Sequence, residues 1–115
     1  MRKSDKKIEK QLRDALNQVC DQLLEENIGF QWVTHLVDYD RFPASLKIIC
    51  IFETEAAMSQ YQASQGFAAL PNLVNRALES QQIVLKNLKK HLFFDNEEAC
   101  SRTHEGNWAA RLKRF

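Results

Sequence analysis

The feature that most constrains the fold is a short run of β-type residues, residues 46–52, that is apolar on both of its faces. A strand sends successive side chains to opposite faces of its sheet. One face of this strand would carry Leu46, Ile48, Cys50 and Phe52, and the other would carry Ile49 and Ile51. Because both faces are apolar, the segment is expected to be an interior strand of a sheet.

Residues 30–37 predict a second strand, because they are rich in aromatic and β-branched types and lack helical spacing. One face would carry Phe30, Trp32, Thr34 and Leu36, and the other Gln31, Val33, His35 and Val37. The connection, residues 38–45, is made of turn-type residues and is too short for a crossover helix. We therefore expect the two strands to pair antiparallel as a hairpin.

An amphipathic helix is predicted over residues 5–26, before the hairpin. Its apolar stripe recurs at spacings of three and four, with polar positions between: Ile8, Leu12, Leu16, Val19 and Leu23. Ser4 is the expected N-cap, and Asn27 with Gly29 the expected stop.

Two further helices are expected after the hairpin. Thr54 would cap a short helix over residues 55–61, Gly66 would break the chain, and Pro71 would lie in the first turn of the next helix. Residues 83–95 fit both a helical and a strand pattern, and we place a strand between residues 90 and 95. Residues 96–107 are expected to form a loop, and residues 108–115 a short closing helix or a tail.

The resulting order is α-β-β-α-α-β, an α+β two-layer sandwich with a small, mainly antiparallel sheet and its helices on one sheet face. The 115 residues fit one domain, residues 1–115, with fraying expected at residues 1–4 and 109–115.

The chain is expected to be cytoplasmic. The opening residues lack the apolar core of a secretory signal, and no window reaches the roughly 18 apolar residues of a membrane span. Cys20, Cys50 and Cys100 are odd in number and widely spaced, which is not a disulfide framework.

The sequence predicts neither a zinc site nor a catalytic cysteine. Cys100 and His104 have the spacing of one pair of zinc ligands, but a structural zinc site needs four ligands. Cys50 could act as a nucleophile only with a base, and His35 would point to the opposite sheet face. We therefore expect no enzyme activity, no metal and no cofactor.

The formal charge is only +1, but it is unevenly distributed. Residues 1–13 carry six basic side chains against two acidic ones, and residues 76–90 carry four basic side chains against Glu79. These stretches could form one surface for a polyanion if the fold brings them together. Solvated helix faces would account for the same charges.

Exposed aromatic residues around the hairpin would offer a stacking surface for single-stranded nucleic acid. The candidates are Trp32, Tyr39, Phe42 and Tyr61. The acidic residues of this stretch weaken that interpretation.

The order of elements resembles the KH-like domain of ribosome-binding factor A over residues 8–98. The helix from Ile8, the hairpin ending in Ile-Cys-Ile-Phe and the segment Leu92-Phe93-Phe94-Asp95-Asn96 fall in matching order. Ser64-Gln65-Gly66 stands where that family has a small-x-Gly kink, with Ser in place of Ala. The resemblance implies a KH-like sandwich and an RNA or ribosomal partner.

The chain also resembles small proteobacterial proteins carried under a Fis-family transcriptional-regulator label, through the segments at residues 1–8, 30–37 and 45–52. That label implies a DNA-binding helix, and only Asn75-Arg76 and residues 85–90 are similar to its recognition helix. A recognition helix needs its side chains free to reach bases, whereas Leu85 and Leu88 are expected to be buried.

The leading hypothesis is a non-catalytic domain that binds RNA or DNA and has no membrane role. The expected phosphate contacts are Lys86, Lys89 and Lys90, supported by Lys3, Lys6 and Lys7. The alternative is a homodimeric protein-interaction module with no nucleic-acid role.

Overall fold

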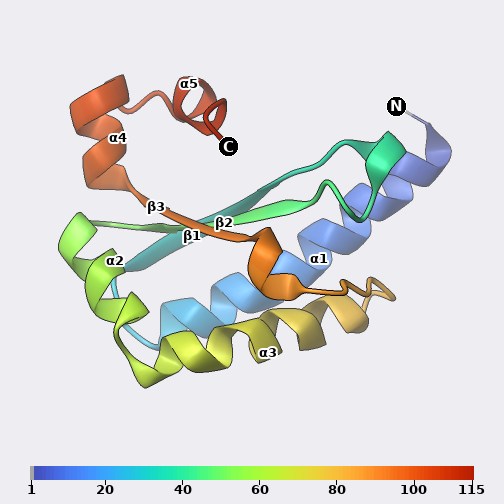
Figure 1. Ribbon diagram of the computed structural model, residues 1–115, viewed down its shortest axis with the longest axis horizontal. Coiled ribbons are helices and arrows are strands. Elements are labelled where there is room, and N and C mark those ends of the chain that lie inside the picture. Colours follow the sequence, from blue (N-terminus) through green and yellow to red (C-terminus); the bar gives the residue numbers. More distant parts are fainter. Residues whose placement is uncertain (1) are drawn as a thin grey trace.

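The computed structural model describes residues 2–115, which form an α+β protein with the order α-β-β-α-α-β-α-α (Figure 1). Its helices are α1 (Lys3–Glu25), α2 (Glu55–Gln62), α3 (Gln65–Glu79), α4 (Glu97–His104) and α5 (Trp108–Leu112). Its strands are β1 (Phe30–Leu36), β2 (Lys47–Phe52) and β3 (Leu92–Asn96). It also has two short 3₁₀ turns, η1 (Tyr39–Arg41) and η2 (Leu88–His91). None of the helices in the described part is long and apolar enough to cross a membrane.

The three strands form one sheet in the order β1-β2-β3, so β2 is the interior strand, as its two apolar faces predicted. β1 and β2 pair antiparallel, which confirms the hairpin. β3 pairs parallel to β2, so the sheet is mixed and the expectation of a mainly antiparallel sheet was wrong. The reason is the crossover through α2 and α3, which returns the chain to the sheet in the direction of β2.

The predicted faces of β2 are confirmed, but those of β1 are not. A β-bulge at Gln31 shifts the register between Phe30, opposite Phe52, and Trp32, opposite Ile51. The extra residue puts Phe30 on the same face as Val33 and His35, whereas strict alternation had grouped it with Trp32. These three β1 residues therefore share the face of β2 that points toward α1 and α3.

The main core lies between that face and the two long helices, α1 and α3. The apolar stripe of α1 is buried there as predicted, with Leu12 and Val19 at 0% exposure. The helix begins at Lys3, and its N-cap is Arg2 rather than Ser4. The guanidinium of Arg2 donates to the Asp5 carboxylate at 3.2 Å across this first turn. Asn27 and Gly29 adopt positive φ values after the helix, which confirms the predicted stop.

The short helix α2 begins as predicted, with the Thr54 hydroxyl accepting a hydrogen bond from the Ala57 N–H. α3 begins at Gln65, so Gly66 lies inside the helix and Pro71 in its interior, not in its first turn. A Cβ at Gly66 would lie 3.2 Å from the Tyr61 ring, so the glycine lets that ring approach. Ser64, Gln65 and Gly66 therefore lie at the junction of the two helices.

The ambiguous stretch before the last strand is neither an α-helix nor a continuous strand. Residues 83–87 are irregular, η2 follows, and β3 begins at Leu92, close to its predicted position. Leu85 and Leu88 are buried, as expected.

The second face of the sheet is covered by the C-terminal segment, which lies on the opposite side from α1 and α3 (Figure 1). Ile49 and Ile51 of β2 are fully buried on that face. The expected loop at residues 96–107 was wrong, because the Asn96 side chain accepts a hydrogen bond from the Ala99 N–H and caps α4. The expectation of helices on one sheet face only was therefore wrong as well.

A buried ion pair fastens this segment to the sheet. Asp95 of β3 and Arg111 of α5 are 4% and 5% exposed, and Nε of Arg111 donates to Asp95 Oδ2 at 2.6 Å. Nη2 donates to the other carboxylate oxygen at 2.9 Å. Burial alone would raise the pKa of Asp95, but the hydrogen bonds from Arg111 and the Asn96 N–H, with the nearby arginine charges, hold it below its ordinary value.

Replacing Arg111 by Met should destabilise the fold by about 3 kcal/mol at neutral pH, because the change leaves the Asp95 carboxylate buried without its main partner. Since the folded pKa of Asp95 is depressed, the stabilisation is fully present above the ordinary carboxyl pKa of about 4. It is lost as the pH falls through the lower folded value. Urea unfolding of both proteins across this pH range measures the difference.

Lys10→Met is the matched control, because Lys10 and Asp14 form an exposed ion pair at 2.9 Å. Its removal should change stability by no more than about 0.5 kcal/mol. An Arg111→Met protein that is as stable as the control would show that the buried pair does not hold the C-terminal segment.

Candidate nucleic-acid interface

The six predicted lysines are all exposed, but the structure divides them into two groups. Lys86, Lys89 and Lys90 lie in and just before η2, between α3 and β3. The other group is at the start of α1. We call residues 86–91 the basic turn.

Buried leucines hold the basic turn in place on either side of Lys86. Leu85 is 9% exposed and Leu88 is 4% exposed, and both belong to the main core. Because these side chains point inward, the lysines beside them are left at the surface. The alternation of leucine and lysine in the sequence therefore fixes which side chains reach solvent.

An apolar hollow of about 460 Å³ lies on one side of the basic turn, between α3 and β3. We call it the β3 groove. Its lining residues are Phe67, Ala68, Pro71, Lys89, Leu92 and Phe94. The rings of Phe67 and Phe94 are half-buried and meet edge to face, with centroids 5.4 Å apart.

Two backbone features add hydrogen-bonding groups near the β3 groove. β3 is an edge strand of the described sheet, so half of its backbone N–H and C=O groups point away from β2. Pro71 has no N–H, so the carbonyl of Phe67 lacks its usual helical donor. The groove thus combines an apolar floor with the nearby backbone groups of the β3 edge.

A second hollow of about 430 Å³ lies on the other side of the basic turn, and we call it the Val84 hollow. Its lining residues are Pro43, Ala44, Val84, Leu85, Lys86, Asn87, Lys90 and His91. Val84 is 70% exposed there. The structure therefore brings Lys86 and Lys90 together in one hollow and places Lys89 at the rim of the other.

Lys3, Lys6 and Lys7 lie on the first two turns of α1 and line neither hollow. Their surroundings are acidic. Asp5 lies in the same turn, and Arg2 of the helix end donates to Asp40 at 2.6 Å. These carboxylates offset part of the positive charge of the helix end, which weakens its attraction for phosphate.

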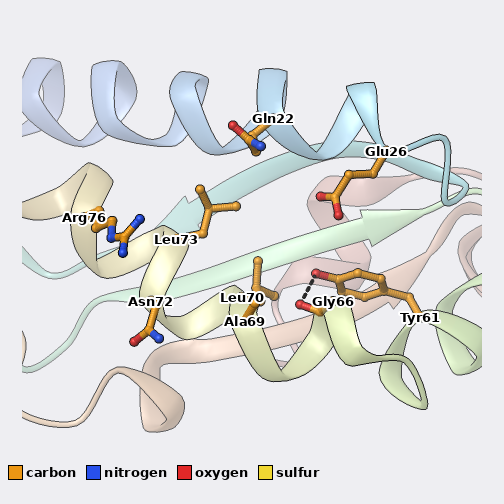
Figure 2. A pocket seen from close by; sticks show the side chains of 9 residues that line it. All are labelled: Gln22, Glu26, Tyr61, Gly66, Ala69, Leu70, Asn72, Leu73 and Arg76. Atoms are coloured by element: carbon orange, nitrogen blue, oxygen red, sulfur yellow. Dashed lines mark hydrogen bonds between the residues drawn. The ribbon is translucent and has the colours of Figure 1, made fainter.

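A different hollow, of about 300 Å³, lies between α1 and α3 (Figure 2). Figure 2 shows Glu26 and Tyr61 at one end of it and Arg76 at the other. The Tyr61 hydroxyl donates to the Gly66 carbonyl at 3.2 Å, and burial raises the pKa of Tyr61 to about 12, so this hydroxyl stays protonated. None of the six predicted lysines lines this hollow, and the Glu26 carboxylate disfavours a phosphate there.

Cys50 and His35 both lie on the sheet face that points to the helices, so the expectation that His35 points away was wrong, because of the bulge in β1. Cys50 pairs with Val33, and His35 with Ile48. Burial, with a smaller effect of Cys20, raises the pKa of the Cys50 thiol to about 12. A thiol with that pKa is protonated at neutral pH and is a poor nucleophile.

Cys100 and His104 lie on α4, and neither is placed as a metal ligand. Cys100 is fully buried, and the Nδ1 atom of His104 lies 3.2 Å from Nη1 of Arg111. Among residues 2–115, no three or more His, Cys, Asp and Glu side chains gather as they would around a metal ion.

The aromatic residues that line the β3 groove, Phe67 and Phe94, are not among the four suggested by the sequence. Tyr61 is only 4% exposed, and Trp32 packs against Trp108, with ring centroids 5.1 Å apart. Phe67 and Phe94 were overlooked because they belong to separate elements that meet only through the crossover. The one available signal was that Phe94 follows closely after the lysine-rich stretch in the sequence.

Neither protein-family models nor curated proteins nor solved structures match the chain. The lining residues of the β3 groove and the Val84 hollow include three lysines, one histidine and no Asp or Glu. Such a surface can bind a flexible polyanion that also carries flat apolar groups.

Proposed function

We propose that this chain is a non-catalytic domain that binds single-stranded nucleic acid along the β3 groove and the basic turn. The observation that carries the proposal is the coincidence of two properties in one place. Apolar and aromatic side chains line the groove, and exposed lysines lie beside it. The lining residues of the groove and of the Val84 hollow include no carboxylate. Single-strand sites combine stacking surfaces with a positively charged path for the backbone.

The β3 groove supports recognition of unpaired bases. The half-buried rings of Phe67 and Phe94 offer apolar edges and faces to a base, and the free edge of β3 offers backbone hydrogen bonds. Bases in a duplex are already stacked and paired, and their faces cannot reach such a groove. A single strand is therefore the better substrate.

The lysines support binding of the phosphate backbone. Lys89 lies at the groove, while Lys86 and Lys90 continue the positive charge into the Val84 hollow. A strand whose bases enter the groove would pass its phosphates over the basic turn. Lys3, Lys6 and Lys7 would then add only long-range attraction.

The KH-like resemblance fits this proposal better than the Fis-family label. The order of elements and the helix junction at Ser64-Gln65-Gly66 agree with a KH-like arrangement. A helix-turn-helix motif would need an α-helix over residues 85–90. The chain instead has an irregular segment and a 3₁₀ turn there.

A homodimeric protein-interaction module is the second candidate. Two observations favour it: Val84 is 70% exposed, and β3 has a free edge beside an apolar hollow. Such features can pair with a second copy of the chain. A dimer that forms at micromolar concentration and binds no oligonucleotide would favour this alternative.

Replacing Lys86, Lys89 and Lys90 together by Gln should weaken binding to a single-stranded oligonucleotide. The slope of log affinity against log salt concentration should fall by about 2, because each phosphate contact contributes about 0.7 for a single strand. Fluorescence anisotropy titrations over a range of salt concentrations measure both effects.

A matched control removes the same charge elsewhere, at the exposed residues Arg13, Arg102 and Lys113. It should leave the salt slope near that of the unchanged protein. Equal losses in the two triple variants would show that only net charge matters and would contradict a localised site.

Ala68→Glu tests the groove itself, because Ala68 is exposed and lines it. The added carboxylate would occupy the groove and repel phosphate. We expect binding to be at least about tenfold weaker, which is the loss of affinity caused by removing one base-stacking contact.

Ala69→Glu is the control, since this neighbouring exposed alanine lines the α1–α3 hollow instead. The same charge on the adjacent helix face should change affinity by no more than about twofold, since screening limits its reach. If Ala69→Glu were the more damaging change, the site would lie between α1 and α3.

A further inference from the structure

The last residue of the basic turn, His91, has one of its two ring nitrogens fixed by the fold. Its Nδ1 lies 2.7 Å from the carbonyl oxygen of Leu46, the residue just before β2. A carbonyl oxygen only accepts hydrogen bonds, so Nδ1 carries the hydrogen and donates it. Leu46 is 1% exposed, and its N–H donates to the Pro43 carbonyl, which holds this acceptor in place.

The other ring nitrogen, Nε2, is left as a hydrogen-bond acceptor in the neutral imidazole. Within residues 2–115 it has no hydrogen-bond partner. Every buried side-chain nitrogen or oxygen of these residues has a partner, so Nε2 is not among the buried atoms. Nε2 therefore reaches solvent. His91 lines the Val84 hollow together with Lys86 and Lys90, so its imidazole shares this hollow with two cationic side chains.

When a nucleic-acid strand displaces the water at this acceptor, the hydrogen bond is kept only if the strand supplies a donor. Phosphate oxygens only accept hydrogen bonds, and the deoxyribose of DNA carries no hydroxyl at its 2′ carbon. The ribose 2′-hydroxyl is a donor that lies close to the phosphates of every RNA nucleotide. RNA is thus the form of nucleic acid that supplies a partner for Nε2 wherever its backbone crosses these lysines.

We propose that Nε2 of His91 accepts a hydrogen bond from a ribose 2′-hydroxyl, so that the domain prefers single-stranded RNA to DNA. This inference rests on the proposed function and specifies the ligand of the same site. One neutral hydrogen bond corresponds to a preference of about three- to tenfold.

The test compares three oligonucleotides of ten uridines that differ only at the 2′ position: hydroxyl, fluorine and hydrogen. Binding is measured by fluorescence anisotropy at about pH 8. We expect the hydroxyl form to bind about three- to tenfold more tightly than both others. The 2′-fluoro form keeps an RNA-like sugar but has no hydroxyl to donate, so equal binding of the hydroxyl and fluoro forms would overturn the inference.

His91→Phe keeps a ring of similar shape without either nitrogen, and its folding is checked by thermal unfolding. This variant should bind the hydroxyl form as weakly as the fluoro form, with little change for the other two oligonucleotides. An equal loss for all three would indicate a structural role and contradict the proposal. Equal binding of all three by the unchanged protein would leave the proposed function standing and only this inference wrong, whereas no binding to any would overturn both.

Discussion

The whole architecture depends on burying both faces of β2. Ile48, Cys50 and Phe52 require a cover on one side, and the long helices α1 and α3 supply it. Ile49 and Ile51 require a cover on the other side, and it comes from the C-terminal segment, held by the ion pair between Asp95 and Arg111. Because β2 also needs a strand on each edge, the chain must return from α3 to place β3 beside it. The lysine-rich stretch is the connection that makes this return.

This arrangement explains why the candidate interface is where it is. A crossover that ends in an edge strand leaves a seam between α3 and β3, and the seam becomes the β3 groove. Leu85 and Leu88 hold the connection against the core, so its lysines project beside the seam. The hydrogen bond from His91 to the Leu46 carbonyl joins the same connection to the start of β2. The surface features that suggest nucleic-acid binding are thus consequences of how the central strand is buried.

Much of the fold could be predicted from local patterns, and the failures have specific physical causes. The two apolar faces of β2 and the stripe of α1 are repeated signals, and both were read correctly. The bulge at Gln31 leaves no trace in an alternating pattern, so it reversed the inferred side of His35. α4 was overlooked because it buries little beyond Ala99 and Cys100, although the capping residue Asn96 was visible. Among site residues, the exposure of the lysines was predictable. The pairing of Phe67 with Phe94 was not, because it depends on the parallel return of β3.

The central claim is that the β3 groove and the basic turn form one binding surface. Its most direct test is an NMR titration of the isotope-labelled protein with a single-stranded oligonucleotide of uridines, which locates the contact without altering any residue. The account predicts that amide signals of residues 67–70 and 84–94 shift together and saturate together. Shifts confined to the α1–α3 hollow, at residues such as Gln22 and Arg76, or no shifts at all, would contradict it.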